Sequence, residues 1–367
     1  MDPIISLSHE LIEKGSKSFA MAAKLLPRDV RYDAMMLYAW CRHCDDVIDD
    51  QILGFARESA SSETPAERLE QLREKTKRAL EGDADEPVFI ALGRVARKHG
   101  IPERHPMELL RGFEMDVNGR VYDTLEDTLD YCYHVAGVVG VMMAMIMGVR
   151  DRPTLNRASD LGIAFQLTNI SRDVVEDAEG GRCYLPREWL REAGIDGADL
   201  SDPEHRKAVF QVTRKLLQEA DDYYRSALFG MQRLPLGAAV GIGCARRVYR
   251  DIGRIVASRG ESAWDGRAIV GKTRKAAAAI SGAIAAIRAH TTLRLGYAPN
   301  RTGLWTVPGL GKATPMNRPF AFLINQEMRR LLMRDSSDLA PSRFGRFRRQ
   351  QTQGSFSSHG DAPSLRH

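Results

Sequence analysis

The chain has 367 residues, of which 43% are hydrophobic and 28% are charged. This composition is typical of a soluble globular protein, and the length allows one large domain or two ordinary ones with a sizeable core. The net charge is +5, and eight arginines against three acidic residues between residues 318 and 349 account for it. The basic excess therefore belongs to the C-terminal end, and the preceding 317 residues are neutral as a whole.

The N-terminus and the cysteine content argue against a secreted or membrane-spanning protein. The first ten residues, MDPIISLSHE, have neither the basic nor the apolar segment of a secretory leader. Five cysteines, an odd number without such a leader, indicate reduced thiols in a cytoplasmic protein. The longest apolar run, residues 135–149, contains three glycines and is too short to span a bilayer comfortably. We expect this run to be a buried helix.

Helical periodicity dominates the chain, and we find no convincing series of alternating strands. In chain order, we expect helices at about residues 8–26, 29–50, 65–81, 86–99, 106–119, 125–148, 153–178, 204–230, 236–258 and 267–292. Glycine and proline interrupt the pattern at residues 100–102, 180–181 and 234–235. Ten or so helices with short connections predict an all-α fold, a single large helical bundle with its ligand site in a central cavity.

We expect one all-α domain over residues 1–295, followed by two segments of different character. Residues 296–340 begin with a stretch rich in glycine and proline, and are predicted to be an irregular to helical basic extension. Residues 341–367 are polar and poor in large apolar side chains, which predicts a disordered tail.

Two of the predicted helices carry a stripe of polar side chains on an otherwise apolar segment. The first stripe has the spacing i, i+4, i+7 and i+11, and consists of Tyr38, Arg42, Asp45 and Asp49. The second has the spacing i, i+3, i+7 and i+11, and consists of Gln166, Asn169, Asp173 and Asp177. Each stripe therefore contains an Asp-x-x-x-Asp pair with further polar groups aligned above it.

Solvated helix ends would be the ordinary explanation for a single Asp-x-x-x-Asp pair. Aligned carboxylates four residues apart repel each other, however, and desolvation adds several kcal/mol per ion where they face the interior without a compensating cation. Mg²⁺ prefers carboxylate oxygens and commonly completes its coordination shell with water and substrate phosphates. Two such stripes facing each other across a bundle predict a clamp for Mg²⁺ and a diphosphate.

Five short stretches resemble those of the head-to-head prenyl synthases, the squalene and phytoene synthases of the all-α isoprenoid-synthase fold. In family order they are GSKSF (15–19), YAWCRHCDDVID (38–49), YCYHVAGVVG (131–140), FQLTNISRDVVEDAEGGRCYLP (165–186) and RAIVGKTRK (267–275). The region that they bracket covers nearly all of residues 10–290. Each stretch alone is a weak signal, whereas five in the family's order are a strong one.

The resemblance implies a reaction in two steps. One prenyl diphosphate ionises to an allylic cation, which the double bond of a second molecule attacks to give a cyclopropylcarbinyl diphosphate. This intermediate ionises in turn, rearranges and, in the phytoene reaction, loses a proton. Such an enzyme is a prenyltransferase that depends on Mg²⁺, with Mn²⁺ as an alternative.

The resemblance also implies a role for each matching residue. The expected metal ligands are Asp45, Asp49, Asn169, Asp173 and Asp177. The expected contacts to the diphosphates and the phosphate end of the substrates come from Arg42, Arg172, Ser16, Ser18, Tyr249, Arg267 and Lys272. Tyr131 and Tyr38 are expected near the carbocation or in proton handling, and Gln166 is expected to contact the substrate.

Most of these residues also have an ordinary structural explanation, which the sequence leaves open. Tyr131 would serve equally as a core aromatic residue with a satisfied hydroxyl group. Ser16 would fit a mid-helix serine that bonds back to the preceding turn. Arg267 and Lys272 would fit surface charges, and Arg42 would fit a structural ion pair with a neighbouring acid.

Members of this family differ in the chain length of their prenyl substrate and in whether NADPH reduces the product. No glycine-rich dinucleotide fingerprint follows a predicted strand, and we expect no NADPH requirement. Ala20, Ala22 and Ala23 follow the phosphate-end serines and would leave room for a long prenyl chain. We also find no C-terminal membrane-spanning helix of the kind typical of eukaryotic squalene synthases. This observation and the small side chains favour two molecules of geranylgeranyl diphosphate coupled to phytoene, the first committed step of carotenoid biosynthesis. A squalene or dehydrosqualene synthase that uses farnesyl diphosphate is the alternative.

Other enzymes of this fold match the sequence less well. Chain-elongating prenyltransferases usually carry two DDxxD motifs, whereas the second cluster here, DVVED, does not begin with two aspartates. Terpene cyclases often carry Asn-x-x-x-Ser-x-x-x-Glu, and Asn169, Asp173 and Asp177 share that spacing without its residue types. The YCYHVAG and YLP stretches favour head-to-head coupling.

The basic C-terminal region leaves a different class of protein open, a non-catalytic helical binding protein. Residues 343–349, RFGRFRR, interleave arginine with phenylalanine as in some nucleic-acid contacts. We expect no nucleic-acid partner, because the acidic stripes would then have no role. Residues 322–334, FLINQEMRRLLMR, would suit an interfacial helix at an anionic membrane, and a solvated helix remains equally compatible. The predicted localisation is cytoplasmic, with peripheral membrane association through this region.

Overall fold

The computed structural model of the chain describes residues 3–15, 23–52, 55–56, 62–291 and 300–308. The α-helices in these ranges are α1 (Pro3–Gly15), α3 (Arg28–Ile48), α4 (Pro65–Glu81), α5 (Pro87–His99), α6 (Arg104–Val117), α7 (Leu125–Cys132), α8 (Val138–Ile146), α9 (Arg152–Glu179), α10 (Arg187–Glu192), α11 (Arg206–Gly230), α12 (Leu236–Arg259) and α13 (Lys272–Thr291). One π-helical turn, Tyr133–Gly137, joins α7 to α8, and 3₁₀ turns cover Pro203–His205, Met231–Arg233 and Gly260–Trp264. Two antiparallel strands of two residues each, β1 (Gln51–Ile52) and β2 (Phe55–Ala56), follow α3.

The all-α prediction is confirmed, with differences at particular helices. The sequence analysis missed α10, because six residues are too few to show helical periodicity. The last expected helix begins at Lys272, five residues later than predicted, and the first begins at Pro3. Residues 16–22 of that first expected helix lie outside the description. The predicted division at residue 295 stays a prediction, since most of the residues beyond it also lie outside the description.

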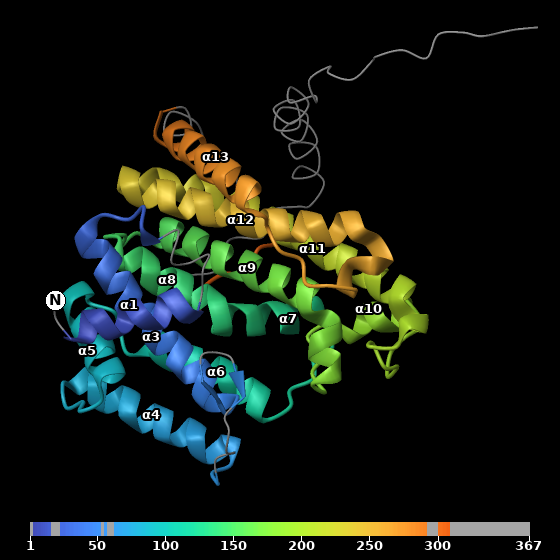
Figure 1. Ribbon diagram of the computed structural model, residues 1–367, viewed down its shortest axis with the longest axis horizontal. Coiled ribbons are helices and arrows are strands. Elements are labelled where there is room, and N and C mark those ends of the chain that lie inside the picture. The colour runs from blue at the N-terminus through green and yellow to red at the C-terminus, as the bar shows by residue number, and fades with distance from the viewer. Residues whose placement is uncertain (1–2, 16–22, 53–54, 57–61, 292–299, 309–367) are drawn as a thin grey trace, which may run out of the picture. The chain divides into compact units, whose positions relative to one another are not determined.

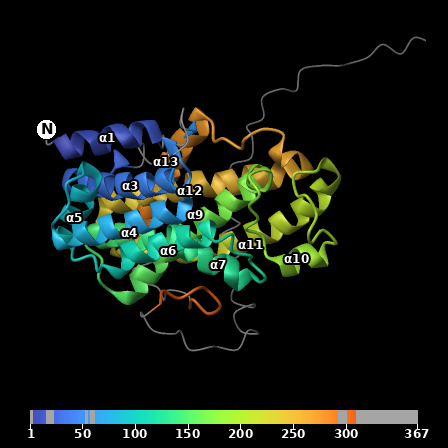
Figure 2. The same cartoon turned by 90° about the horizontal axis from the view of Figure 1, so that it is seen from below.

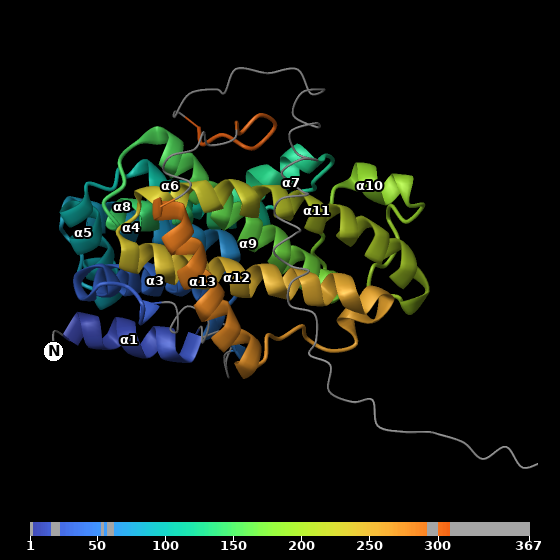
Figure 3. The same ribbon diagram turned by 90° about the horizontal axis from the view of Figure 1, so that it is seen from above.

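Helix α9 lies in the middle of the bundle (Figure 1). It packs against α8 on one side and against α11 and α12 on another, while α3 packs against α1 and α5. Helix α13 crosses over α12, as the view from above shows (Figure 3). This arrangement brings the two helices with acidic stripes, α3 and α9, into one core with α6 and α8.

Glycines allow α9 to lie close to α8 and to the π-helical turn that precedes α8. A Cβ atom added to Gly162 would lie 2.2 Å from the carbonyl oxygen of Ala136, and one added to Gly140 would lie 2.4 Å from that of Ala158. Both distances are far below van der Waals contact, so larger side chains would push the two helices apart.

The apolar run of residues 135–149 is a core element, as the sequence predicts. Among the described residues, one continuous helical stretch, Leu125–Ile146, is long and apolar enough to cross a membrane. Inside the bundle, 67% of its most apolar window is buried, and Val138, Val141 and Met142 are fully buried.

Candidate active site

A cavity of about 450 Å³ lies inside the bundle, walled by α3, α6, α8, α9, α11 and α12. Most of its wall is apolar, with Val, Met, Leu, Ala and Gly side chains from all of these helices. Eight of the side chains predicted for the site line it: Tyr38, Arg42, Asp45, Asp49, Tyr131, Gln166, Asn169 and Tyr249. The C-terminal halves of α3 and α9 supply most of these polar groups, which therefore gather at one end of the cavity.

Other predicted residues lie beyond the cavity wall. Four belong to the C-terminal end of α9 or the loop before α13: Arg172, Asp173, Asp177 and Arg267. Ser16 and Ser18 lie outside the described residues. Lys272 begins α13, and its side chain is likewise outside the description.

Two adjacent carboxylates of α3 contact the same arginine. Arg42 Nη1 lies 3.1 Å from Asp45 Oδ2, and Arg42 Nη2 donates to Asp46 Oδ1 at 2.7 Å. Burial raises the pKa of Asp45 to about 6, with the carboxylates of Asp49 and Asp46 adding to the effect and Arg42 opposing it. Because 43% of the Asp45 side chain is exposed, water and Arg42 offset part of the cost of its charge, and a divalent cation would offset more.

The carboxylates of α9 show the same electrostatic character. Burial and the neighbouring Asp173 raise the pKa of Asp177 to about 7. Asp173 accepts hydrogen bonds from Nε of Arg172, at 2.7 Å, and from its Nη2, while Arg267 Nη2 lies 4.0 Å away. Arg172 is thus paired with the adjacent Asp173, and Arg267 lies near the same carboxylate, while its expected contact with a diphosphate stays a prediction.

Two residues that the sequence analysis did not single out connect the acidic helices. Arg182, in the loop after α9, donates to Asp49 Oδ1 of α3 at 2.8 Å, a contact across 133 residues of sequence. Asp116 of α6 accepts hydrogen bonds from the hydroxyl groups of Tyr131, at 3.0 Å, and Tyr184, at 2.9 Å. Burial raises the pKa of Asp116 to about 6.

Sequence signals for these missed residues exist. Leu109, Phe113 and Asp116 have the spacing i, i+4 and i+7, and all three line the cavity, so an acid ends an apolar helical stripe. Arg182 and Tyr184 belong to the family-like stretch 165–186, where the aspartates attracted the assignment.

Aromatic rings line the cavity on two sides. The Tyr131 and Tyr184 rings stack with centroids 4.7 Å apart and planes 18° apart. The Tyr249 ring stacks on Phe165 at 4.2 Å, and both residues line the cavity. Electron-rich ring faces attract a positive charge. The two pairs are therefore suited to a cationic ligand or intermediate.

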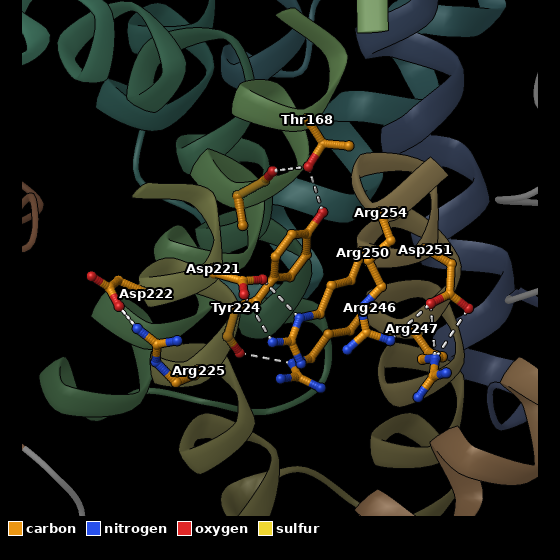
Figure 4. A network of polar contacts seen from close by, with 11 residues as sticks. Thr168, Asp221, Asp222, Tyr224, Arg225, Arg246, Arg247, Arg250, Asp251 and Arg254 are labelled. Atoms are coloured by element: carbon orange, nitrogen blue, oxygen red, sulfur yellow. Dashed lines mark hydrogen bonds and ion pairs between the residues drawn. The ribbon is translucent and has the colours of Figure 1, made fainter. Parts of the chain in front are cut away.

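The helix that carries Tyr249 is tied to its neighbours by a polar network (Figure 4). Arg250 donates to both carboxylate oxygens of Asp221 on α11, at 2.8 and 3.1 Å, and Arg246 Nε donates to the carbonyl oxygen of Tyr224 at 2.8 Å. The Tyr224 hydroxyl lies 2.9 Å from Thr168 Oγ1 of α9. These bonds link α12 to α11 and α11 to α9, and thereby fix the position of Tyr249.

The donor set at the polar end fits a hard divalent cation. Its side-chain atoms are oxygens of aspartate and asparagine, which Mg²⁺ and Mn²⁺ prefer. Asn169 Oδ1 is buried and accepts no hydrogen bond from the described residues, although Asn169 Nδ2 donates to Gln166 Oε1 at 3.4 Å. No group of three or more His, Cys, Asp or Glu side chains is close enough to form a protein-only cage within the part of the chain described. The carboxylates instead stand on two facing helices.

Comparison with known proteins identifies the family. The squalene/phytoene synthase family model matches residues 12–274. The chain belongs to the squalene/phytoene synthase family. This finding confirms the resemblance drawn from the five short motifs.

Relatives in this family cover most of the chain. A 15-cis-phytoene synthase of Enterobacter agglomerans is 50% identical over 297 residues, which are 81% of this chain and 100% of that one. A 15-cis-phytoene synthase of Pantoea ananas is 48% identical over 82% of this chain and 96% of its own. The crystal structure of a dehydrosqualene synthase with ligand superposes with a TM-score of 0.68 at 27% identity, over 76% of this chain and 95% of that chain.

Proposed function

We propose that this chain is a phytoene synthase, a prenyltransferase that couples two geranylgeranyl diphosphates head to head in carotenoid biosynthesis. The observation that carries the proposal is an apolar cavity with two carboxylate-bearing helices, α3 and α9, at one end. An apolar chamber suits prenyl chains, and the polar end suits their diphosphates. The high identity to 15-cis-phytoene synthases over their whole length supports the same activity.

The polar end would hold and separate the diphosphates. Mg²⁺, or Mn²⁺ in its place, would be held by Asp45, Asp49, Asn169, Asp173 and Asp177 and would neutralise the charge that develops on the leaving diphosphate. The guanidinium groups of Arg42 and Arg182 line the same end and would donate hydrogen bonds to diphosphate oxygens. Arg172 and Arg267 both lie at Asp173. When substrate binds, they would turn from this carboxylate and donate hydrogen bonds to phosphate oxygens.

The apolar part would protect the cationic intermediates from water. After the first ionisation, the double bond of the second substrate attacks the allylic cation and gives a cyclopropylcarbinyl diphosphate. This intermediate ionises, rearranges and loses a proton to give phytoene. The rings of Tyr131 and Tyr249 would face the cations. The Tyr131 hydroxyl is fixed by Asp116, whose pKa of about 6 suits a proton acceptor near neutral pH.

A forty-carbon product needs a long cavity, and small side chains favour one. Ala23 lines the cavity, as do Ala34, Gly140 and Gly162, whereas Ala20 and Ala22 lie outside the described residues. These small side chains support geranylgeranyl over farnesyl diphosphate.

The deciding experiment is an assay of the purified protein with Mg²⁺, offering geranylgeranyl or farnesyl diphosphate separately, with and without NADPH. We expect a forty-carbon product with a conjugated triene from the geranylgeranyl substrate, formed at the same rate without NADPH. A thirty-carbon product from farnesyl diphosphate alone would assign the chain to the squalene or dehydrosqualene synthases instead. Absence of coupling with either substrate would refute the proposal.

The raised pKa values predict how pH and metal ions affect stability. Asp45, Asp116 and Asp177 have pKa values of about 6, 6 and 7 in the folded protein, against 3.8 without burial. The folded protein therefore binds protons more tightly than the unfolded chain between about pH 4 and pH 7, and its stability falls as pH rises through this range. In calorimetry without divalent ions, we expect the melting temperature to decrease from pH 5.5 to pH 8.

Added ligand and one variant test this explanation. Mg²⁺ with inorganic diphosphate should raise the melting temperature at pH 8 more than at pH 5.5, because binding stabilises the ionised carboxylates. His134, whose pKa burial lowers, acts in the opposite direction below about pH 6.5. The Asp177→Asn variant leaves His134 in place, so a pH slope equal to that of the wild type would contradict the role of Asp177.

We also propose peripheral association with a membrane, which suits an enzyme with apolar substrates and product. The basic residues 322–334 lie outside the description. Among described residues, Ile280, Ile284 and Ile287 of α13 form a stripe at i, i+4 and i+7 and are 65%, 52% and 53% exposed. The full chain should float with anionic liposomes more than a chain ending at residue 317. Equal flotation would remove the C-terminal region from the proposal.

A further inference from the structure

Arg157 is a charged side chain that lines the cavity far from Asp45 and Asp49, the carboxylates of the polar end. The lining residues of α9 run from Asn169 back to Arg157 and Thr154, and a rise of 1.5 Å per residue places Thr154 about 22 Å from Asn169. Arg157, Thr154, Met231 and Leu234 line this distal end, and each is less than 9% exposed. By contrast, 43% of the Asp45 side chain is exposed. The cavity is therefore enclosed at the Arg157 end.

Hydrogen bonds fix the Arg157 side chain against α11. Its Nη1 donates to both the carbonyl oxygen and Oγ of Ser226, each at 3.0 Å. Its guanidinium carbon lies 5.5 Å from the ring centroid of Phe229. A Cβ added to Gly230, which also lines the cavity, would lie 2.9 Å from Arg157 Cβ, so the stem of Arg157 occupies the space beside that glycine.

Ser226 and Arg157 belong to a buried network that reaches the C-terminal segment. Ser226 Oγ donates to Asp160, which is completely buried on α9. Asp160 also accepts hydrogen bonds from Arg301 Nε, at 2.8 Å, and Arg301 Nη2. A carboxylate buried to this extent needs such a bidentate partner, because an unpaired one would cost several kcal/mol.

Arg301 lies in residues 300–308, here called the C-terminal strap, which runs along one face of the bundle (Figures 2 and 3). The strap is bonded to the helices that carry the network. The Trp305 amide donates to the Tyr223 hydroxyl of α11 at 3.0 Å, and the Val307 amide donates to Asn156 Oδ1 of α9 at 3.1 Å. Val307 is 1% exposed. The strap is therefore part of the packed bundle at the distal end of the cavity.

We propose that Arg157 sets the distal limit of the cavity and so selects the length of the prenyl diphosphate, with Asp160, Ser226 and Arg301 as its positioning residues. This inference rests on the proposed function, because it takes the ligand to be a prenyl diphosphate. A longer chain would have to break the bonds of Arg157 to Ser226, and leaving those buried groups unpaired is costly. The methionines elsewhere in the wall, such as Met143 and Met147, adapt more easily.

The test compares substrates of 15, 20 and 25 carbons in the full chain. For Arg157→Ala we expect the kcat/KM for geranylfarnesyl diphosphate relative to geranylgeranyl diphosphate to rise by about tenfold or more, the scale on which apolar pockets discriminate by size. The matched control is Arg152→Ala, which removes an exposed arginine of the same helix and should leave the ratio unchanged. An unchanged ratio in Arg157→Ala would overturn the proposal.

The positioning residues are tested with the double variant Asp160→Asn, Arg301→Met, which removes both buried charges together. We expect a rise of the same ratio by about threefold, whereas a purely structural role would lower kcat/KM for all chain lengths equally. If Arg157→Ala does not fold, Arg157→Met keeps most of the side-chain volume and is measured in its place.

Binding separates this proposal from the proposed function. Calorimetry with unreactive thiodiphosphate analogues of the three chain lengths reports selectivity without turnover. Suppose that the wild type couples no substrate but binds analogues of one chain length preferentially, and that Arg157→Ala binds all three lengths alike. The limit at Arg157 then stands and the proposed function fails. If the wild type makes phytoene, and Arg157→Ala and the double variant bind the analogues with the wild-type length preference, the limit at Arg157 fails while the proposed function stands.

Discussion

Asparagine in place of Asp45 or Asp177 is expected to reduce phytoene formation by about a hundredfold to a thousandfold, the effect of losing one electrostatic group aimed at a developing charge. Asparagine keeps the size of the side chain and its place on the helix, but it removes a charged ligand for the metal ion. Each carboxylate has a raised pKa, so its charge opposes folding in the absence of metal. Both variants should therefore melt no lower than the wild type at pH 8 while losing turnover.

This opposite sign of the two effects makes the prediction specific. A residue needed only for packing would lose stability and activity together, whereas a functional carboxylate should lose activity alone. Glu176→Gln is the matched control, because it removes an exposed carboxylate beside Asp177 on α9 that is not among the expected metal ligands. We expect it to keep turnover within about twofold, as for other surface substitutions. Wild-type turnover by Asp177→Asn with saturating Mg²⁺ would exclude the metal clamp.

Three features explain how much of the fold followed from the sequence. Long helices such as α9 and α11 present many turns of apolar periodicity, and their predicted limits are within a few residues of the observed ones. The π-helical turn Tyr133–Gly137 depends on contact with α9, which local periodicity does not encode. The packing of residues 300–308 depends on Arg301 reaching Asp160 across 141 residues of sequence.

The site shows the same division between local and distant information. The stripes of α3 and α9 follow from helical spacing alone, and eight of the predicted side chains do line one cavity. The partners of Asp116 and Arg182, which are Tyr131, Tyr184 and Asp49, are set by tertiary packing, so sequence signals at these two positions do not reveal their contacts. Spacing reveals which side chains share a helix face, whereas tertiary packing decides which faces meet.

Burial is the largest cause of the three raised carboxylate pKa values, and repulsion between carboxylates adds a smaller contribution. Asp116 contributes to raising the pKa of both Asp45 and Asp177, so the three groups on α6, α3 and α9 act on one another across the polar end of the cavity. Arg42 and Arg182 offset part of this repulsion. A divalent cation would balance the remaining negative charge. Bound there, it would stabilise the charge that develops on the leaving diphosphate.

The π-helical turn Tyr133–Gly137 packs closely against Gly162 of α9, and Gly162→Ala is the second change with a large expected effect. The new Cβ would lie 2.2 Å from the carbonyl oxygen of Ala136 and 2.8 Å from Gly137 Cα. Both are backbone atoms, which cannot rotate away as a side chain can. We expect the free energy of unfolding to fall by about 3 kcal/mol, the upper part of the range for overpacking. Denaturant unfolding followed by circular dichroism measures this loss.

Gly266→Ala is the control for that substitution, because no atom lies within 4 Å of its new Cβ and its φ is not positive. Its expected effect is below about 0.5 kcal/mol. Since Gly162 also lines the cavity, the methyl group should reduce turnover of the twenty-carbon substrate at temperatures where the variant remains folded. A Gly162→Ala protein with wild-type stability would mean that α9 and the π-helical turn Tyr133–Gly137 can separate without cost. The close contact at Gly162 would then contribute nothing to the stability of the bundle.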